Sequence, residues 1–136
     1  ELAHTVGQQA VIVTVEARRS DLGWELLVDS GREATGIDAL SWIERLDSYG
    51  AGEVVVTSID REGTLSGCDL DLYRAARSST PLPLIAHGGV GSANDVVQVA
   101  DIGLDGVLVA KALHSGSLEV SDARRALKRA GHEVRT

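Results

Sequence analysis

The sequence lacks several features that mark particular protein classes. It has no methionine, no phenylalanine, a single cysteine (Cys68) and only 3% aromatic residues. One cysteine cannot form an internal disulfide, so nothing indicates an oxidising compartment and we expect the cytoplasm. With so few aromatics, the core has to be built from Val, Ile, Leu and Ala, which is typical of buried parallel strands. Because methionine is absent, we expect that Glu1 is not a native translation start.

Basic charge and long apolar runs are also scarce. The 136 residues carry 13 Lys and Arg against 20 Asp and Glu, a formal net charge of −7. This balance argues against nucleic acid as a partner, because phosphate backbones attract a basic excess. Apolar runs such as residues 11–15 are far shorter than the roughly 20 residues of a membrane helix, and no charged-then-apolar leader opens the chain. We therefore expect a soluble protein without a membrane partner.

One structural unit recurs four times along the chain. Each unit is a short β-branched apolar run, a turn rich in small polar residues, and a segment of helical periodicity. The predicted strands are residues 10–15, 54–59, 82–86 and 106–110, and the predicted helices are residues 38–48, 69–78, 92–101 and 121–130, capped by Asp38, Asp69, Ser92 and Ser121. The apolar runs are continuous, which indicates strands covered on both faces. A small hairpin is predicted within residues 18–36, where residues 24–28 form a β-favouring stretch.

Four consecutive βα units predict one α/β domain over residues 1–136. A whole (βα)8 TIM barrel needs about 250 residues, so we expect a (βα)4 half-barrel with parallel strands. Such a half exposes two sheet edges and an apolar concave face. It is expected to be completed by dimerisation or by a missing amino-terminal half. The alternative is a small open flavodoxin-like sheet that is complete by itself.

Ligand sites in barrels lie at the carboxyl ends of the strands. Residues 87–92 read HGGVGS before a predicted helix, so the amides of Gly88 and Gly89 and the helix start predict an anion cradle, the alternative being a tight turn. The last strand ends in Ala110 and Lys111, which supply further amides and a cation. Alternatively, Lys111 is a solvated surface lysine.

Carboxylates follow the first two predicted strands. Glu16 ends the first strand, so it is a candidate general acid or base, or else a solvated strand-end carboxylate. Asp60 and Glu62 follow the second strand, after Thr57 and Ser58, and are placed for proton transfer. The alternative is a polar turn in which Asp60 bonds its own backbone.

No metal or cofactor is expected. His4, His87, His114 and His132 show no metal-ligand spacing, and neither a Walker A nor a dinucleotide-binding motif occurs. Cys68 has no base nearby in the sequence, so it is predicted to be a packed thiol rather than a nucleophile.

Several motifs, in order along nearly the whole chain, resemble one family. They are residues 9–13 (QAVIV), 50–53 (GAGE), 57–64 (TSIDREGT), 66–67 (SG), 88–91 (GGVG) and 131–135 (GHEVR). Together they resemble the cyclase (HisF-type) subunit of imidazole glycerol phosphate synthase, from histidine biosynthesis. The resemblance covers the carboxy-terminal half of that family, strands five to eight.

The resemblance implies a lyase activity and a set of site residues. Members are (βα)8 barrels that use ammonia from a glutaminase subunit to cleave and cyclise a ribulosyl bis-phosphate, and each half binds one phosphate. By resemblance, the phosphate of this half is bound at Gly88, Gly89, Ala110 and Lys111. Glu16 takes the place of a catalytic aspartate, and Glu53 lies in a charged ring at the ammonia entrance. The substrate-proximal residues are then Thr57, Ser58, Asp60, Glu62 and His87.

The sequence also departs from the family pattern. Glu16 and Glu62 stand where aspartates are usual, and His87 and Lys111 stand where small residues, often serine, lie beside the phosphate. Three functions therefore remain open. The chain is part of a cyclase that is active when completed, a self-associating phosphate-binding half-barrel without cyclase activity, or a homologue that acts with a glutaminase on a sugar nucleotide.

Overall fold

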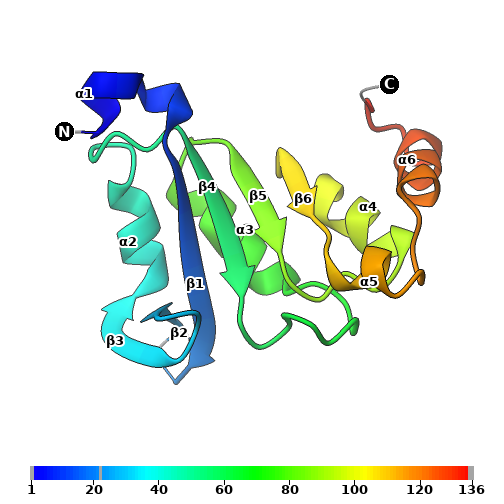
Figure 1. The fold of residues 1–136 in the computed structure, drawn as a ribbon, viewed down its shortest axis with the longest axis horizontal. Helices are drawn as coiled ribbons and strands as arrows, with labels where there is room; N and C mark the ends of the chain where they lie inside the picture. Colours follow the sequence, from blue (N-terminus) through cyan, green and yellow to red (C-terminus); the bar gives the residue numbers. More distant parts are fainter. Residues whose placement is uncertain (1, 22, 135–136) are drawn as a thin grey trace.

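The fold is built on a six-stranded, mostly parallel sheet (Figure 1). The computed structural model describes residues 2–21 and 23–134. The strand order is β3-β2-β1-β4-β5-β6. The parallel strands are β1 (Ile12–Ser20), β4 (Glu53–Ser58), β5 (Leu84–His87) and β6 (Gly106–Leu108). An antiparallel hairpin of β2 (Gly23–Val28) and β3 (Glu33–Asp38) extends the sheet beyond β1.

The four predicted helices form after the parallel strands, as α2 (Ala39–Arg45), α3 (Leu70–Ser79), α4 (Ala93–Asp101) and α6 (Val120–Arg129). Helix α1 (Leu2–Val6) and the 3-10 turn η1 (Gln8–Ala10), which precede β1, and the short helix α5 (Lys111–His114) were not predicted. Figure 1 shows α3 and α4 on the far side of the sheet. Within the described ranges, no helix is long and apolar enough to cross a membrane. The protein is thus an α/β fold.

The two faces of the sheet differ in how well they are covered. On the helix-covered face, Val15, Val56 and Leu84 are fully buried together with Ile43 and Tyr73. Because side chains alternate along a strand, Ile12 and Leu108 lie on the opposite face, which we call the open face. Ile12 is 57% exposed and Leu108 42%. The prediction that the strands are covered on both faces is therefore wrong for β1 and β6, the first and last of the four parallel strands.

The hairpin forms where it is predicted, and its pairing with β1 lengthens that strand. Residues from Glu16 to Ser20 pair with β2, so β1 continues five residues past the predicted end at residue 15. Glu16 consequently lies inside the strand and not at its end. Pairing with β2 begins at Glu16, so residues 12–15 of β1 have no partner in β2.

Local capping agrees with the prediction at three of four helices. Asp38 accepts a hydrogen bond from the Ser41 amide at 2.7 Å, Asp69 caps α3 in the same way, and Ser92 caps α4. Ser121 is the exception, because α6 begins at Val120 and its N-cap position is Glu119. The Ser121 hydroxyl lies within the first turn and donates to the Glu119 carboxylate.

Candidate functional site

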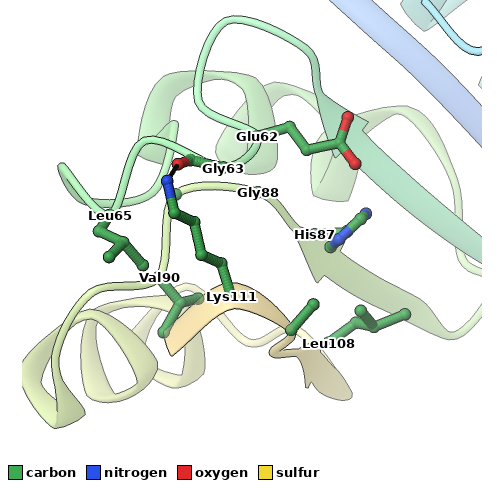
Figure 2. A pocket seen from close by; sticks show the side chains of 10 residues that line it. Glu62, Gly63, Leu65, His87, Gly88, Val90, Leu108 and Lys111 are labelled. Carbon is green, nitrogen blue, oxygen red and sulfur yellow. Dashed lines mark hydrogen bonds between the residues drawn. The ribbon is translucent and has the colours of Figure 1, made fainter. Parts of the chain in front are cut away.

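A pocket of about 130 Å³ lies at the carboxyl ends of β5 and β6, beside the loop that follows β4 (Figure 2). Six predicted site residues line it: Glu62, His87, Gly88, Gly89, Ala110 and Lys111. The structure adds four lining residues that were not predicted as site residues: Gly63, Leu65, Val90 and Leu108. Residues far apart in sequence therefore meet at one place, as a barrel-type site requires.

Close packing of two loops explains the glycines beside this pocket. Gly89 has φ +89°, and a Cβ on it would lie 2.1 Å from the Gly67 carbonyl oxygen. A Cβ on Gly91 would lie 2.2 Å from the Leu65 carbonyl oxygen. The Gly67 amide donates to the Gly89 carbonyl at 2.9 Å. The loop that follows β4 thus packs directly on residues 88–91, and phosphate binding by these glycines stays a prediction.

The amino end of α4 is capped by a side chain of its own. The Asp95 carboxylate oxygen Oδ2 accepts from the Gly91 amide at 3.0 Å and from the Ser92 amide at 2.8 Å. Ser92 Oγ in turn accepts from the Asp95 amide. Ser92 and Asp95 form a capping box, a pattern that their spacing of three residues could have indicated.

His87 is held in place by two neighbours. Its Nδ1 lies 3.1 Å from Thr57 Oγ1, which is nearly fully buried. Its carbonyl accepts a hydrogen bond of 2.6 Å from the Tyr73 hydroxyl. Burial raises the pKa of Tyr73 well above its usual range, so the phenol stays a proton donor to this carbonyl. No feature of the sequence pointed to Tyr73.

Charged side chains of opposite sign occupy two parts of the pocket. The Lys111 ammonium donates to the Gly63 carbonyl. The Glu62 carboxylate and the His87 ring lie on the side away from that ammonium (Figure 2). The pocket therefore has a cation at one end, and at the other end a glutamate and a histidine, residue types that can act as acids and bases.

Glu16 lies on the open face, on β1, which β4 and β5 separate from β6. Its Oε2 accepts a hydrogen bond of 2.7 Å from the Gly31 amide in the turn of the hairpin. In the register of the sheet, Glu16 is level with Thr57, and Thr57 is level with His87. The sheet thus places Glu16 in the same row as the residues beside the pocket.

Five predicted site residues do not line the pocket: Glu16 and Thr57, which lie in the row of the sheet just described, and Asp60, Ser58 and Glu53. Asp60 accepts from the Arg19 amide at 2.7 Å, so it links its loop to β1 instead of bonding its own backbone. The Ser58 side chain is fully buried on the helix-covered face, where it donates to Asp69. Glu53 begins β4, at the opposite end of the strands.

Cys68 is a half-buried thiol, as the sequence predicts for a packed residue. Burial, reinforced by the charge of Asp95, raises the pKa of Cys68 to about 12. In the described part of the chain, no three His, Cys, Asp or Glu side chains are grouped so as to hold a metal ion.

The raised pKa predicts slow alkylation of Cys68. Only the thiolate reacts, and an ordinary cysteine has a pKa of about 8.5. Iodoacetamide at pH 8 is expected to modify the folded chain about a thousandfold more slowly than the chain unfolded in urea, as followed by mass spectrometry. Equal rates in the two states would contradict the burial of the thiol.

Comparisons with known proteins agree with this architecture. Residues 1–119 match the family model described as "Histidine biosynthesis protein". The imidazole glycerol phosphate synthase subunit HisF of Beutenbergia cavernae is 42% identical over 141 residues, covering 99% of this chain and 55% of the relative. The HisF subunit of Metallosphaera sedula is 43% identical over 131 residues, covering 96% and 52%. That of Streptomyces coelicolor is 39% identical over 136 residues, covering 99% and 54%.

In all three comparisons the alignment covers nearly all of this chain but only part of the relative. Nearly all of this chain aligns, but it spans about half the length of the curated relatives it matches. Four parallel strands with helices between them are consistent with that length. The chain belongs to the histidine biosynthesis protein family and is related to the HisF subunit of imidazole glycerol phosphate synthase.

Proposed function

We propose that this chain is a single (βα)4 domain that forms the carboxy-terminal half of a HisF-type cyclase barrel. When completed, the barrel would catalyse the ammonia-dependent cleavage and cyclisation of a phosphorylated metabolite. The observation that carries the proposal is the pocket at the ends of β5 and β6, in a chain that matches half of HisF. In this function the pocket binds one phosphate of the substrate, through Gly88, Gly89, Ala110 and Lys111.

Glu16 would act as the general acid or base. The Gly31 amide fixes Oε2 of its carboxylate, and Oε1 is the oxygen that would exchange a proton with the substrate. Thr57 and His87 continue the same row of the sheet toward the phosphate pocket. A substrate whose phosphate lies in the pocket would therefore extend along this row toward Glu16.

Glu53 marks the opposite end of the barrel. It begins β4, so its side chain is placed at the amino ends of the parallel strands. We propose that it belongs to the charged ring through which ammonia enters, and that a glutaminase subunit docks at this end.

Production of imidazole glycerol phosphate tests the proposal directly. The chain would be combined with the amino-terminal half of a HisF subunit, and product formation from the bis-phosphate substrate and ammonia measured by absorbance. Ammonia-dependent product is expected. Its absence, together with intact phosphate binding by the chain, would favour the alternative of a phosphate-binding half-barrel without cyclase activity.

The open face favours self-association when the other half is missing. Ile12 and Leu108 are exposed at the two outer parallel strands. Residues 12–15 of β1 are not paired with the hairpin, so the backbone on that side of β1 can pair with another strand. A second copy can supply both a strand edge and an apolar face.

Replacing Ile12 by Lys is therefore expected to weaken a dimer. Burying an aliphatic side chain contributes about 1.5–3 kcal/mol, so the dissociation constant should rise at least about tenfold. Sedimentation of the chain over a range of concentrations measures it. The matched control is Val120→Lys, because Val120 is 50% exposed on α6, outside the sheet. A wild-type chain that stays monomeric at high concentration would contradict self-association.

A further inference from the structure

We propose that Ile59 is a positioning residue for the proposed reaction. Its side chain packs against the turn between β2 and β3, residues 29–32, and keeps that turn in the conformation that holds the Glu16 carboxylate. The inference rests on the proposed role of Glu16 as the general acid or base. It adds the residue from a distant segment of the chain on which the position of this carboxylate depends.

The turn between β2 and β3 has an unfavourable backbone conformation. Asp29, Ser30 and Gly31 follow one another with φ angles of +53°, +58° and +75°. This left-handed region is uncommon for residues other than glycine. Across the turn, the Arg32 amide donates to the Val28 carbonyl at 3.2 Å. We infer that contacts from outside the hairpin stabilise the turn, and with it the position of the Gly31 amide.

Ile59 provides such a contact. A Cβ on Gly31 would lie 2.7 Å from Cδ1 of Ile59, 3.2 Å from its Cγ1 and 3.3 Å from its Cγ2, so the isoleucine side chain packs closely beside the Gly31 backbone. The amide of the same glycine donates to Glu16 Oε2 at 2.7 Å. Gly31 therefore joins the two residues, because its backbone contacts Ile59 and its amide binds the carboxylate.

The backbone of Ile59 is anchored to β1. Ile59 directly follows β4, and its amide donates at 2.9 Å to the carbonyl of Ala17, the residue after Glu16. The next residue, Asp60, accepts from the Arg19 amide at 2.7 Å. Two hydrogen bonds to β1 thus fix the position of Ile59 relative to Glu16.

The loop that begins at Ile59 also reaches the pocket. Glu62, Gly63 and Leu65 belong to this loop and line the pocket. Loss of the Ile59 side chain leaves these lining residues in place but removes the contact with the hairpin turn. The catalytic rate should therefore fall while binding of the substrate is retained.

Amide hydrogen exchange at Gly31, followed by NMR of the 136-residue chain, tests the contact directly. Ile59→Ala is expected to speed exchange of this amide at least about tenfold, because the turn opens more often. The matched control is Ile37→Ala, which removes the same atoms from an isoleucine of β3 that is 43% exposed, and it should leave the exchange rate unchanged. Unchanged exchange in Ile59→Ala, or an equal increase in the control, would overturn the inference.

Turnover by the completed barrel tests the consequence for catalysis. Ile59→Ala should lower kcat about tenfold to a hundredfold, the cost of displacing a catalytic group by about 1 Å, and change KM less than about threefold. In a Glu16→Gln background the same substitution should cause no further loss of kcat, since the positioned carboxylate is already absent. A loss that persists in that background would contradict positioning through Glu16.

Gly31→Ala tests the contact from the other side. Its new Cβ would meet the Ile59 side chain, so kcat should fall here as well. In the double variant Gly31→Ala/Ile59→Ala, the new methyl group occupies space that the isoleucine leaves. Its kcat should therefore exceed the product of the two single effects at least about twofold. Strictly independent effects would mean that the two residues do not act through their contact.

The outcomes separate this inference from the proposed function. No ammonia-dependent product, or wild-type turnover in Glu16→Gln, would overturn the proposed function of Glu16 and the inference with it. Impaired turnover in Glu16→Gln but wild-type turnover in Ile59→Ala would overturn the inference alone. Thermal melts of each variant establish that the chain is folded.

Discussion

Glu16→Gln is expected to lower turnover by the completed barrel about a hundredfold to ten-thousandfold, because a positioned general acid or base contributes that much to a rate. Glutamine keeps an oxygen that can accept from the Gly31 amide, which Glu16 Oε2 does at 2.7 Å. The geometry of the hairpin turn is therefore retained while the exchangeable proton is lost. Steady-state rates with saturating ammonia measure the effect on kcat.

Two further variants make this prediction specific. Glu44→Gln removes the same charge from the exposed side of α2 and should leave turnover unchanged. Glu16→Asp keeps the carboxylate but shortens it by one methylene, which draws it away from Gly31. A displacement of about 1 Å can cost a hundredfold, so this variant should also be impaired. Wild-type turnover in Glu16→Gln would remove Glu16 from the mechanism.

The second large effect concerns folding. Gly89→Ala is expected to lower the free energy of unfolding by about 3–5 kcal/mol, a large part of the roughly 5–15 kcal/mol that stabilises a domain. The left-handed φ of +89° is unfavourable for alanine, and the new Cβ would lie 2.1 Å from the backbone oxygen of Gly67. The loop that follows β4 would have to move away from residues 88–91, and the pocket would be lost with it.

Gly103→Ala is the matched control for this prediction. Gly103 has a similar φ of +85°, but a Cβ there meets nothing within 4 Å. Its substitution should cost only about 1–2 kcal/mol, the strain of the left-handed backbone. Urea denaturation of both variants gives the difference. Equal losses in the two variants would mean that the packing of the loop after β4 against residues 88–91 does not contribute to the free energy of unfolding.

Much of the candidate site could be predicted because neighbouring parallel strands bring their carboxyl ends to one edge of a sheet. The four βα units fix His87 and Lys111 at the ends of successive strands, and the structure places both in one pocket. Asp60 shows the limit of such reasoning. Its carboxylate reaches the Arg19 amide, a residue 41 positions away, and no local pattern indicates that partner.

The order of strands and helices was determined by the sequence itself, since β-branched runs and helical periodicity act over a few neighbouring residues. Capping by Asp38, Asp69 and Ser92 is local in the same way. Tertiary structure alone decided that β1 continues into a hairpin whose turn binds Glu16. It also decided that Gly89 packs against the backbone of a distant loop. These contacts join segments far apart in the chain, so they exist only once the strands have paired and the loops have been brought together.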